Sequence, residues 1–495
     1  MGWHDQVQEL SIDARALIGG VRYEAQSGEA FDVVSPIDGR VIAQASRGRS
    51  ADIDRAVASA RSIFDKGSWA TMAPAARKRV MLKWAELILA NKNELALLEC
   101  IDVGKPIQYA QTVDVNAAAR CIQWYGEAID KVYDEIAPTH ESALALIRRE
   151  AMGVIGCIVP WNYPMIMAAW KLGPAIASGN SVVLKPSEKS PLTAMRLAEL
   201  ALEAGLPAGV FNVVPGFGHE AGEALALHMD VDAIGFTGST RIGRKMYEYA
   251  GKSNLKRVFN ELGGKSANLV FADFDDLERA AATAASCICF NTGQSCNAPS
   301  RLMVQDTIAD DFVAMVAKHM KKQTPGDPLA DGTRLGSVVD QQQLSSILSY
   351  IEKGKAQGAN CIVGGNQVRS ESGGFFVEPT LFDGVTNDMT IAREEIFGPV
   401  LSVIRFKTEE QAIQMANDSA YGLQAGVWST NINRAHRVAR QLKAGTVHVN
   451  QYDDDDITVP FGGYKQSGNG RDKSLHALEK YSELKTTWIR IESAK

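Results

Sequence analysis

One cysteine in a polar bend could carry nucleophilic chemistry. Cys296 stands in the run Gly293-Gln294-Ser295-Cys296-Asn297, between a helical stretch of small residues and an apolar strand candidate at 301–304. A polar and partly exposed position permits the reactive thiolate, whereas buried apolar surroundings raise the pKa of a thiol. Free cysteines usually pack as small hydrophobic residues, so this segment by itself leaves both interpretations open.

Two other polar groups could assist a nucleophile, one as a hydrogen-bond donor and one as a base. Asn162 lies in the turn Pro160-Trp161-Asn162-Tyr163-Pro164, whose prolines and aromatic residues could fix its amide for an oxyanion. Glu261 stands beside Gly263-Gly264, and these glycines could let the carboxylate swing as a general base. The alternatives are a structural turn asparagine and a surface carboxylate. No histidine stands in a comparable motif, so a cysteine–histidine hydrolase has little support.

Two segments that follow strand candidates could bind a dinucleotide, although the usual Gly-x-Gly-x-x-Gly pattern is missing from its ordinary place. Phe236-Thr237-Gly238-Ser239-Thr240 follows a strand and opens a helix, whose free N–H groups could face a phosphate. Lys185-Pro186-Ser187-Glu188 follows the strand candidate 181–184, at the edge where open α/β sheets bind ligands. Glu188 could bind both ribose hydroxyls and repel a 2′-phosphate, which favours NAD over NADP. A plain capped helix and a solvated turn are the alternatives.

The composition predicts a cytoplasmic globular protein. The 495 residues are 45% hydrophobic and 22% charged, and the net charge of −6 offers no long-range attraction for nucleic acid. The seven cysteines are too few for a disulfide framework and lack the spacing of zinc ligands, so we expect no metal site. The first residues do not resemble a signal peptide, and no apolar run approaches the ~20 residues of a membrane helix.

The order of strand and helix candidates predicts an α/β fold with parallel sheets. Strands alternate with helices over residues 153–260, and the alternation returns after Gly264. This pattern is typical of βαβ units whose parallel sheet is covered by helices. We also expect one helix over 74–98 and a terminal strand over 484–491. A strand at the end of the chain has backbone N–H and C=O groups that need partners, which suggests that it pairs with a strand of a partner subunit.

Seven short motifs together resemble those of the aldehyde dehydrogenase superfamily, in register over nearly the whole chain. They are Pro160-Trp161-Asn162, Lys185-Pro186-Ser187-Glu188, Phe236-Thr237-Gly238-Ser239, Glu261-Leu262-Gly263-Gly264-Lys265, Gly293-Gln294-Ser295-Cys296, Glu395-Ile396-Phe397-Gly398-Pro399 and Pro460-Phe461-Gly462-Gly463. The resemblance implies two parallel-sheet α/β domains and a small β oligomerisation domain, in a homotetramer or a homodimer. The implied NAD-binding domain comprises residues 1–131 and 152–261. The implied catalytic domain comprises residues 262–473, and the implied oligomerisation segments are residues 132–151 and 474–495.

The resemblance also implies catalytic roles. Cys296 would attack the aldehyde carbonyl, and Asn162 with the Cys296 backbone N–H would stabilise the oxyanion. A hydride would pass to NAD⁺ or, less favourably, NADP⁺, and Glu261 would activate the water that hydrolyses the thioester. Lys171 and Glu483 match positions thought to relay the proton of this base.

The implied cofactor site follows the strand ends and the Glu395 motif. Lys185 and Glu188 would hold the adenosine ribose, and Ser239 would hold the pyrophosphate. Ile242 would flank the adenine, and Glu395 would bind the nicotinamide ribose. The full set is Ile158, Val159, Pro160, Trp161, Lys185, Ser187, Glu188, Gly218, Phe236, Thr237, Gly238, Ser239, Ile242, Leu262, Glu395 and Phe397.

The expected substrate is an aminoaldehyde. Residues 461–481 look most like the branch of the family that oxidises polyamine-derived aldehydes, including γ-glutamyl-γ-aminobutyraldehyde. The run 453–456 holds four aspartates in the loop that borders the substrate mouth in relatives, where they would concentrate cationic aldehydes. An ordinary solvated loop is the alternative. The expected pocket residues are Tyr163, Met167, Trp170, Ser295, Asn297, Tyr452, Asp453 and Phe461. A broad-specificity aliphatic or aryl aldehyde dehydrogenase, a CoA-acylating relative and a non-catalytic relative are the alternative functions.

Overall fold

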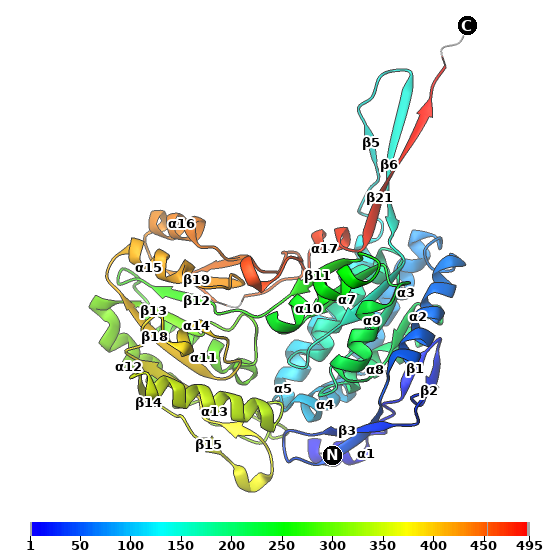
Figure 1. Ribbon diagram of the computed structural model, residues 1–495. Coiled ribbons are helices and arrows are strands. Elements are labelled where there is room, and N and C mark those ends of the chain that lie inside the picture. Colours follow the sequence, from blue (N-terminus) through cyan, green and yellow to red (C-terminus); the bar gives the residue numbers. More distant parts are fainter. Residues whose placement is uncertain (1, 453, 493–495) are drawn as a thin grey trace.

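Two seven-stranded sheets form the body of the molecule, and a three-stranded sheet projects from it (Figure 1). The computed structural model describes residues 2–452 and 454–492. Both large sheets are mainly parallel, so the predicted fold class of two parallel-sheet α/β domains with a small β unit is confirmed. Among the described residues, none of the helices combines the length and the apolar character that crossing a membrane requires.

The first sheet has the strand order β11-β10-β7-β8-β9-β1-β2. Five strands are parallel, and β1 and β2 extend one edge antiparallel. The bounds are β1 Ala16–Ile18, β2 Val21–Tyr23, β7 Val154–Ile158, β8 Ser181–Lys185, β9 Phe211–Val213, β10 Ala233–Thr237 and β11 Arg257–Glu261. Strands β7, β8 and β10 are buried along their whole length, as a parallel sheet between two helical layers requires.

Helices cover both faces of this sheet because successive strand residues point to opposite sides. Ile155 and Cys157 join an apolar cluster with α3, α6, α7 and α8, whereas Val154 and Ile158 join one with α2, α9 and α10. The bounds are α2 Ser50–Asp65, α3 Pro74–Ala90, α4 Lys92–Val103, α6 Val115–Ala128, α7 Pro164–Ala177, α8 Leu192–Glu203, α9 Glu223–Leu227 and α10 Thr240–Lys252.

The helix predicted over 74–98 is two helices, and this expectation was wrong. Helix α3 ends before Asn91, which separates it from α4. The Leu87 carbonyl oxygen accepts from the Asn91 side chain at 2.8 Å and from the Asn91 backbone N–H at 3.0 Å, so the side-chain amide folds back on the last turn of α3. Asparagine side chains compete in this way with regular helical hydrogen bonds. The apolar period continues across the break, and therefore periodicity alone did not reveal it.

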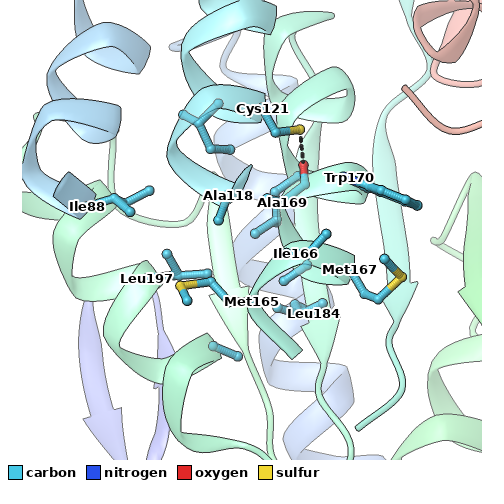
Figure 2. Packing of buried hydrophobic residues seen from close by; sticks show 14 of the residues in the cluster. Ile88, Ala118, Cys121, Met165, Ile166, Met167, Ala169, Trp170, Leu184 and Leu197 are labelled. Carbon is cyan, nitrogen blue, oxygen red and sulfur yellow. Dashed lines mark hydrogen bonds between the residues drawn. The ribbon is translucent and has the colours of Figure 1, made fainter. Parts of the chain in front are cut away.

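Helix α7 is buried on all sides and fixes part of the site. All fourteen of its residues are buried, and it packs against α6, whose Cys121 thiol donates to the Ala169 carbonyl oxygen at 3.3 Å (Figure 2). A Cβ at Gly173 would lie 2.7 Å from the Tyr125 ring, so glycine is what lets the two helices approach. A helix that is buried on all sides cannot rotate without disturbing the close packing around it. Side chains that α7 sends toward the cavity are therefore held rigidly.

The second sheet has the strand order β14-β17-β18-β13-β12-β19-β20, with β14 antiparallel at one edge. Its strands are β12 Ala267–Val270, β13 Arg301–Gln305, β14 Asn360–Val363, β17 Thr380–Asp383, β18 Val400–Phe406, β19 Gln424–Trp428 and β20 Thr446–Val449. One face packs on α11 and α12, and the other on α13, α15 and α16. These helices are α11 Leu277–Cys289, α12 Ala309–Met320, α13 Gln341–Ala356, α15 Glu409–Asn417 and α16 Ile432–Gln441.

The projecting sheet contains the predicted terminal strand, which runs from Ser482 to Arg490 as β21. It pairs antiparallel with β6 (Ala143–Ala151), and β5 (Glu135–Ala137) lies on the other side of β6. The predicted strand over 484–491 is thus confirmed within a residue or two at each end. Most of β21 is exposed, including the apolar side chains of Leu484, Trp488 and Ile489.

Candidate active site

A large cavity brings the three predicted catalytic residues together. The cavity has a volume of 1260 Å³, and Cys296, Glu261 and Asn162 all line it. Glu261 ends β11 and Asn162 follows β7, so both come from the carboxyl edge of the first sheet. Cys296 comes from the segment between α11 and β13, which belongs to the second sheet. The site therefore depends on how the two sheets are placed against each other.

The segment before Cys296 makes a strained left-handed turn. Asn291 and Thr292 have φ angles of 49° and 55°, and Gly293 follows with 68°. Such a backbone costs a non-glycine residue about 1–3 kcal/mol and persists only where surrounding contacts impose it. A Cβ at Gly293 would lie 2.2 Å from the Gly398 carbonyl group, so this position needs glycine. The turn ends α11 and brings the thiol to the cavity.

Hydrogen bonds fix the asparagine turn against the nucleophile segment. Asn162 Nδ2 donates to the Gln294 carbonyl oxygen at 2.8 Å, and Asn291 Nδ2 donates to the Asn162 carbonyl oxygen at 2.9 Å. The Tyr163 hydroxyl and Ser295 Oγ lie 2.5 Å apart. Because an amide group has two N–H donors, the second N–H of Asn162 can serve a ligand in the cavity. This orientation suits a donor to an oxyanion.

Glu261 is a buried carboxyl group with a raised pKa. In the part of the chain that the structure describes, neither of its carboxylate oxygens has a hydrogen-bond partner. Burial and then the charge of Asp472 raise the pKa of Glu261 to about 8, although Lys171 and Lys480 oppose the rise. A carboxyl group that titrates near neutral pH can accept a proton from water and release it again. The environment therefore supports the role of a general base.

Lys171 contacts Asp472 rather than Glu483, so the prediction for Glu483 was wrong. Lys171 and Lys480 both form ion pairs with Asp472, and all three side chains are buried. Glu483 instead pairs with Arg257 at 2.8 Å, and its side chain is 49% exposed. Burial alone would raise the pKa of Asp472, but the charges of the two lysines lower it. Asp472 stands 301 positions from Lys171, and no motif connects the two in the sequence.

The predicted adenosine residues lie at the carboxyl edge of the first sheet. Ile158, Lys185 and Thr237 end the adjacent parallel strands β7, β8 and β10. Lys185 Nζ pairs with Glu188 Oε2 at 3.0 Å, so the carboxylate predicted to bind a ribose is held at this edge. Of the other predicted residues, Val159, Pro160, Trp161 and Ser187 follow β7 and β8, Gly218 follows β9, Phe236 lies in β10, Ile242 lies in α10, and Leu262 follows β11.

The N-terminus of α10 provides groups that suit a pyrophosphate. Thr237, Gly238 and Ser239 line the cavity, and Ser239 caps the helix by accepting from the Ile242 backbone N–H at 3.4 Å. The buried Thr237 hydroxyl has no hydrogen-bond partner within the described chain. Free N–H groups at a helix N-terminus attract anions. An unsatisfied hydroxyl beside them fits a dinucleotide that lies across the strand ends.

Glu395 and Phe397 come from the segment before β18 of the second sheet and contact residues that follow β11 and β7 of the first. The Gly264 backbone N–H donates to Glu395 Oε1 at 2.9 Å, and a Cβ at Gly263 would lie 2.0 Å from the same carboxylate. The two glycines of the predicted bend therefore permit a close approach of Glu395. Phe397 packs edge-on against Trp161 with ring centroids 5.3 Å apart. Burial raises the pKa of Glu395 to about 7.

Most of the predicted substrate residues line the cavity. These are Tyr163, Met167, Trp170, Asn297 and Phe461. Ser295 and Tyr452 do not line it and instead support residues that do, since the Tyr452 hydroxyl donates to the Asn297 carbonyl oxygen at 2.9 Å. Asp453 lies outside the described residues. Lining residues that no motif indicates include Val113, Ser286, Cys287, Phe290, Gln424 and His448.

Acidic side chains and one lysine border the cavity beside the aromatic residues. Asp454, Asp455 and Asp456 all line it, together with Lys473. Lys473 pairs with Asp455, and its Nζ donates to the Asp456 carbonyl oxygen at 3.0 Å. Its Nζ also lies 5.4 Å from the centroid of the Trp170 ring. No sequence motif marks Lys473, because its partners are set only by folding.

Comparison with known proteins identifies the family. The chain matches the model of the aldehyde dehydrogenase family over residues 23–487. The NADP/NAD-dependent aldehyde dehydrogenase PuuC of Escherichia coli (strain K12) is 53% identical over 491 residues, which cover 99% of this chain and 98% of the relative. A crystal structure of indole-3-acetaldehyde dehydrogenase with NAD⁺ is 57% identical, and that of γ-glutamyl-γ-aminobutyraldehyde dehydrogenase from Burkholderia cenocepacia J2315 is 55% identical. Each superimposes with a TM-score of 0.98 and covers 99% of both chains. The chain therefore belongs to the aldehyde dehydrogenase family.

Proposed function

We propose that this protein oxidises an aldehyde to its carboxylic acid through a covalent adduct on Cys296. The meeting of Cys296, Asn162 and Glu261 in one cavity carries the proposal. The three groups supply a nucleophile, a donor for an oxyanion and a base, which are the functions that this oxidation needs from the protein. As a family member, the protein is an oxidoreductase that acts on aldehydes with a nicotinamide cofactor.

Each of these residues has one task. The Cys296 thiolate attacks the carbonyl carbon, and the oxyanion accepts hydrogen bonds from Asn162 Nδ2 and from the Cys296 backbone N–H. A bound nicotinamide dinucleotide supplies the hydride acceptor for the oxidation. Glu261 then takes a proton from the water that attacks the thioester carbon, and the cysteine sulfur leaves as the acid is released.

Replacing Cys296 by alanine tests the reaction directly. The variant should fold normally and form no NADH from any aldehyde, because it has no nucleophile. Turnover of aldehydes by Cys296→Ala at a rate near that of the wild type would contradict the proposal. The measurement is NADH absorbance with a panel of aldehydes, with thermal melting as the check on folding.

The cofactor preference should be for NAD⁺, with NADP⁺ accepted more weakly. Glu188 would compete with a 2′-phosphate for the same space and repel its charge. Lys185 pairs with Glu188, and the charge of Lys189 also acts on this carboxyl group, so both cations already serve Glu188. Glu188→Gln should therefore narrow the ratio of kcat/KM for NAD⁺ over NADP⁺, and an unchanged ratio would argue against this role.

We infer that cationic aminoaldehydes are the preferred substrates. Three aspartates line the cavity near the aromatic residues, and Lys473 neutralises one of them, Asp455. Asp454 and Asp456 remain ahead of the single lysine, and although the charge of Arg120 acts on Asp456, the acidic side chains that line the cavity outnumber Lys473 and should raise the local concentration of cations. The γ-glutamyl-γ-aminobutyraldehyde dehydrogenase among the similar structures supports this inference. The indole-3-acetaldehyde dehydrogenase supports the alternative, a neutral aryl aldehyde held by Trp170 and Phe461.

Charge-neutral replacement of the two remaining aspartates separates these substrates. Asp454→Asn with Asp456→Asn should raise KM for an aminoaldehyde about tenfold and leave KM for a neutral aldehyde of equal length nearly unchanged. Asp311→Asn, an exposed residue of α12, is the control for a lost surface charge. Equal changes in KM for both aldehydes would contradict the inference.

We also propose that the projecting sheet is a contact between subunits. Its apolar side chains Leu484, Trp488 and Ile489 are exposed on a strand whose outer edge could pair with another chain. The resemblance to the family assigns residues 132–151 and 474–495 to oligomerisation, and these exposed side chains support that assignment because a homodimer or homotetramer would bury them. Trp488→Ser with Ile489→Ser should lower the molar mass measured by light scattering, and an unchanged mass would contradict the contact.

A further inference from the structure

We propose that Lys105 is a positioning residue for the nucleophile segment and that it acts through Tyr163. The inference rests on the proposed role of Cys296. Lys105 Nζ lies 4.1 Å from the centroid of the Tyr163 ring, and the hydroxyl of that ring lies 2.5 Å from Ser295 Oγ. Ser295 immediately precedes the nucleophile. A cation, an aromatic ring and a hydroxyl thus form one line of contacts that ends at Cys296.

The ammonium group of Lys105 is itself fixed on both sides. Its Nζ donates to Asp114 Oδ1 at 2.7 Å, and both side chains are only 1% exposed. Asp114 ends a π-helical turn, Ala110–Asp114, and such turns are frequent at functional sites. The preceding residue, Gly104, has a φ of 73°, and a Cβ there would lie 1.9 Å from the Ser337 hydroxyl oxygen. Neither the side chain nor the backbone of Lys105 can shift without breaking a buried contact.

The loop that carries Lys105 is also tied to the segment that supports Gln294. The Ile107 backbone N–H donates to the Pro328 carbonyl oxygen at 2.8 Å, and Gln108 Nε2 donates to the Thr333 carbonyl oxygen at 2.6 Å. Farther along this segment, the Val339 backbone N–H donates to Gln294 Oε1 at 3.0 Å. The nucleophile segment is therefore held from one side by Tyr163 and from the other by residues 328–339, which the Lys105 loop contacts directly.

A buried cation does something here that an apolar side chain would not. An ammonium group is attracted to the face of an aromatic ring, so it selects one orientation of that ring. With one face of Tyr163 turned to Lys105, the hydroxyl at the ring's end is directed to Ser295. A methionine of similar length would fill the space without orienting the ring. Small displacements of a nucleophile reduce reaction rates strongly, so this orientation matters for the attack of Cys296.

A double-mutant cycle tests the proposed line of contacts. Lys105→Met with Asp114→Asn removes the cation and leaves no unpaired buried carboxylate at position 114. Tyr163→Phe removes the hydroxyl and keeps the ring. The readout is the single-turnover rate of NADH formation, measured with enzyme in excess of the aldehyde, because this rate reports the attack and oxidation and excludes thioester hydrolysis.

Each change should lower the single-turnover rate about tenfold, and the combination should lower it no further, since both interrupt the same line. The dissociation constant for NAD⁺ and the pH dependence of thioester hydrolysis should stay as in the wild type, whereas a general loss of structure would move both. If the combined variant instead lowered the single-turnover rate about a hundredfold, the product of the two separate effects, the proposal would be overturned. An unchanged rate in the Lys105 variant would also overturn it.

Two further variants keep the test decisive. If the first variant does not fold, Lys105→Gln removes the cation while its amide can still donate to Asp114, and the same cycle with Tyr163→Phe is expected. Asp102→Asn is the matched control, because Asp102 is a buried acid near the end of α4, just before Lys105. It accepts from the Leu192 backbone N–H at 2.9 Å, and its replacement should leave the rate unchanged. Failure of the cycle overturns the role of Lys105 alone, whereas aldehyde turnover by Cys296→Ala overturns the proposed function.

Discussion

Two buried clusters of charged side chains support the site, and they differ in their balance of charge. The dilysine cluster consists of Lys171, Asp472 and Lys480, with two cations around one carboxylate. The diacid cluster consists of Glu99, Lys105 and Asp114, with two acids around one cation. The first influences the predicted base Glu261, and the second contacts Tyr163.

The comparison shows that burial alone does not set the sign of a pKa shift. Burial raises the pKa of every carboxyl group in both clusters. In the dilysine cluster the two cations outweigh burial, so the pKa of Asp472 is lowered. In the diacid cluster one cation is shared, and the pKa of Glu99 rises to about 8, mainly through burial and then the charge of Asp114. The number of neighbouring cations decides which acid stays ionised.

The largest expected effect comes from removing the group whose pKa the dilysine cluster tunes. Glu261→Gln should lower steady-state kcat by about 10²–10⁴-fold, because it removes the base for thioester hydrolysis. The single-turnover rate of NADH formation should remain close to that of the wild type. In the wild type, kcat should rise with pH as Glu261 loses its proton near pH 8, and the variant should lose this rise. Stopped-flow and steady-state assays separate the two steps.

Glu483→Gln is the matched control, since Glu483 is exposed and pairs with Arg257. This substitution should leave kcat and its pH dependence unchanged. A fall in kcat for Glu483→Gln comparable to that for Glu261→Gln would restore the original prediction for Glu483.

Breaking the dilysine cluster should be the next largest effect. Asp472→Asn leaves two buried cations without their counter-charge, which should lower the free energy of unfolding by about 3–5 kcal/mol. The charge of Asp472 raises the pKa of Glu261, so its loss should move the pH midpoint of kcat below 8. Chemical denaturation and a pH–rate profile measure the two effects. A midpoint that moves upward would contradict the electrostatic account.

The corresponding substitution in the diacid cluster should lower the free energy of unfolding by less than Asp472→Asn does. Asp114→Asn removes one acid, but the pKa of Glu99 then falls, because the charge of Asp114 raises it. Glu99 can therefore ionise and supply the counter-charge for Lys105. We expect a loss of about 1–2 kcal/mol in the free energy of unfolding, measured by denaturation beside Asp472→Asn. Equal losses in the two variants would remove the distinction between the clusters.

The smallest effect concerns how stability varies with pH. Because the pKa of Glu99 rises from 4.5 to about 8 on folding, the folded state retains a proton that the unfolded state releases. The contribution of Glu99 to the free energy of unfolding is greatest below pH 4.5, falls as the pH rises from 4.5 to about 8, and is constant above about 8. Glu99→Gln removes this titration and should therefore flatten the fall that Glu99 contributes. Denaturation of both proteins across the window gives the two slopes, and parallel slopes would contradict the assignment.

The features of the fold and site that could be predicted are those that depend on short stretches of sequence. Parallel strands bury both faces, so β7, β8 and β10 appear as short apolar runs followed by Lys185, Thr237 and the asparagine turn. The break at Asn91 was not predicted, because the apolar period continues from α3 into α4. The terminal strand β21 was predictable from the alternation of its residue types, although nearly all its side chains are exposed.

The sequence by itself determined which residues could react. Cys296, Glu261 and Asn162 each stand in a short motif, and the resemblance of these motifs to one family supplied their roles. Only the tertiary structure decided which charges surround them. Asp472 meets Lys171 across 301 positions, and Lys473 meets Asp455 in a loop without periodic order. Buried ion pairs form wherever folding brings opposite charges together away from water, and no local pattern of residue types records that meeting.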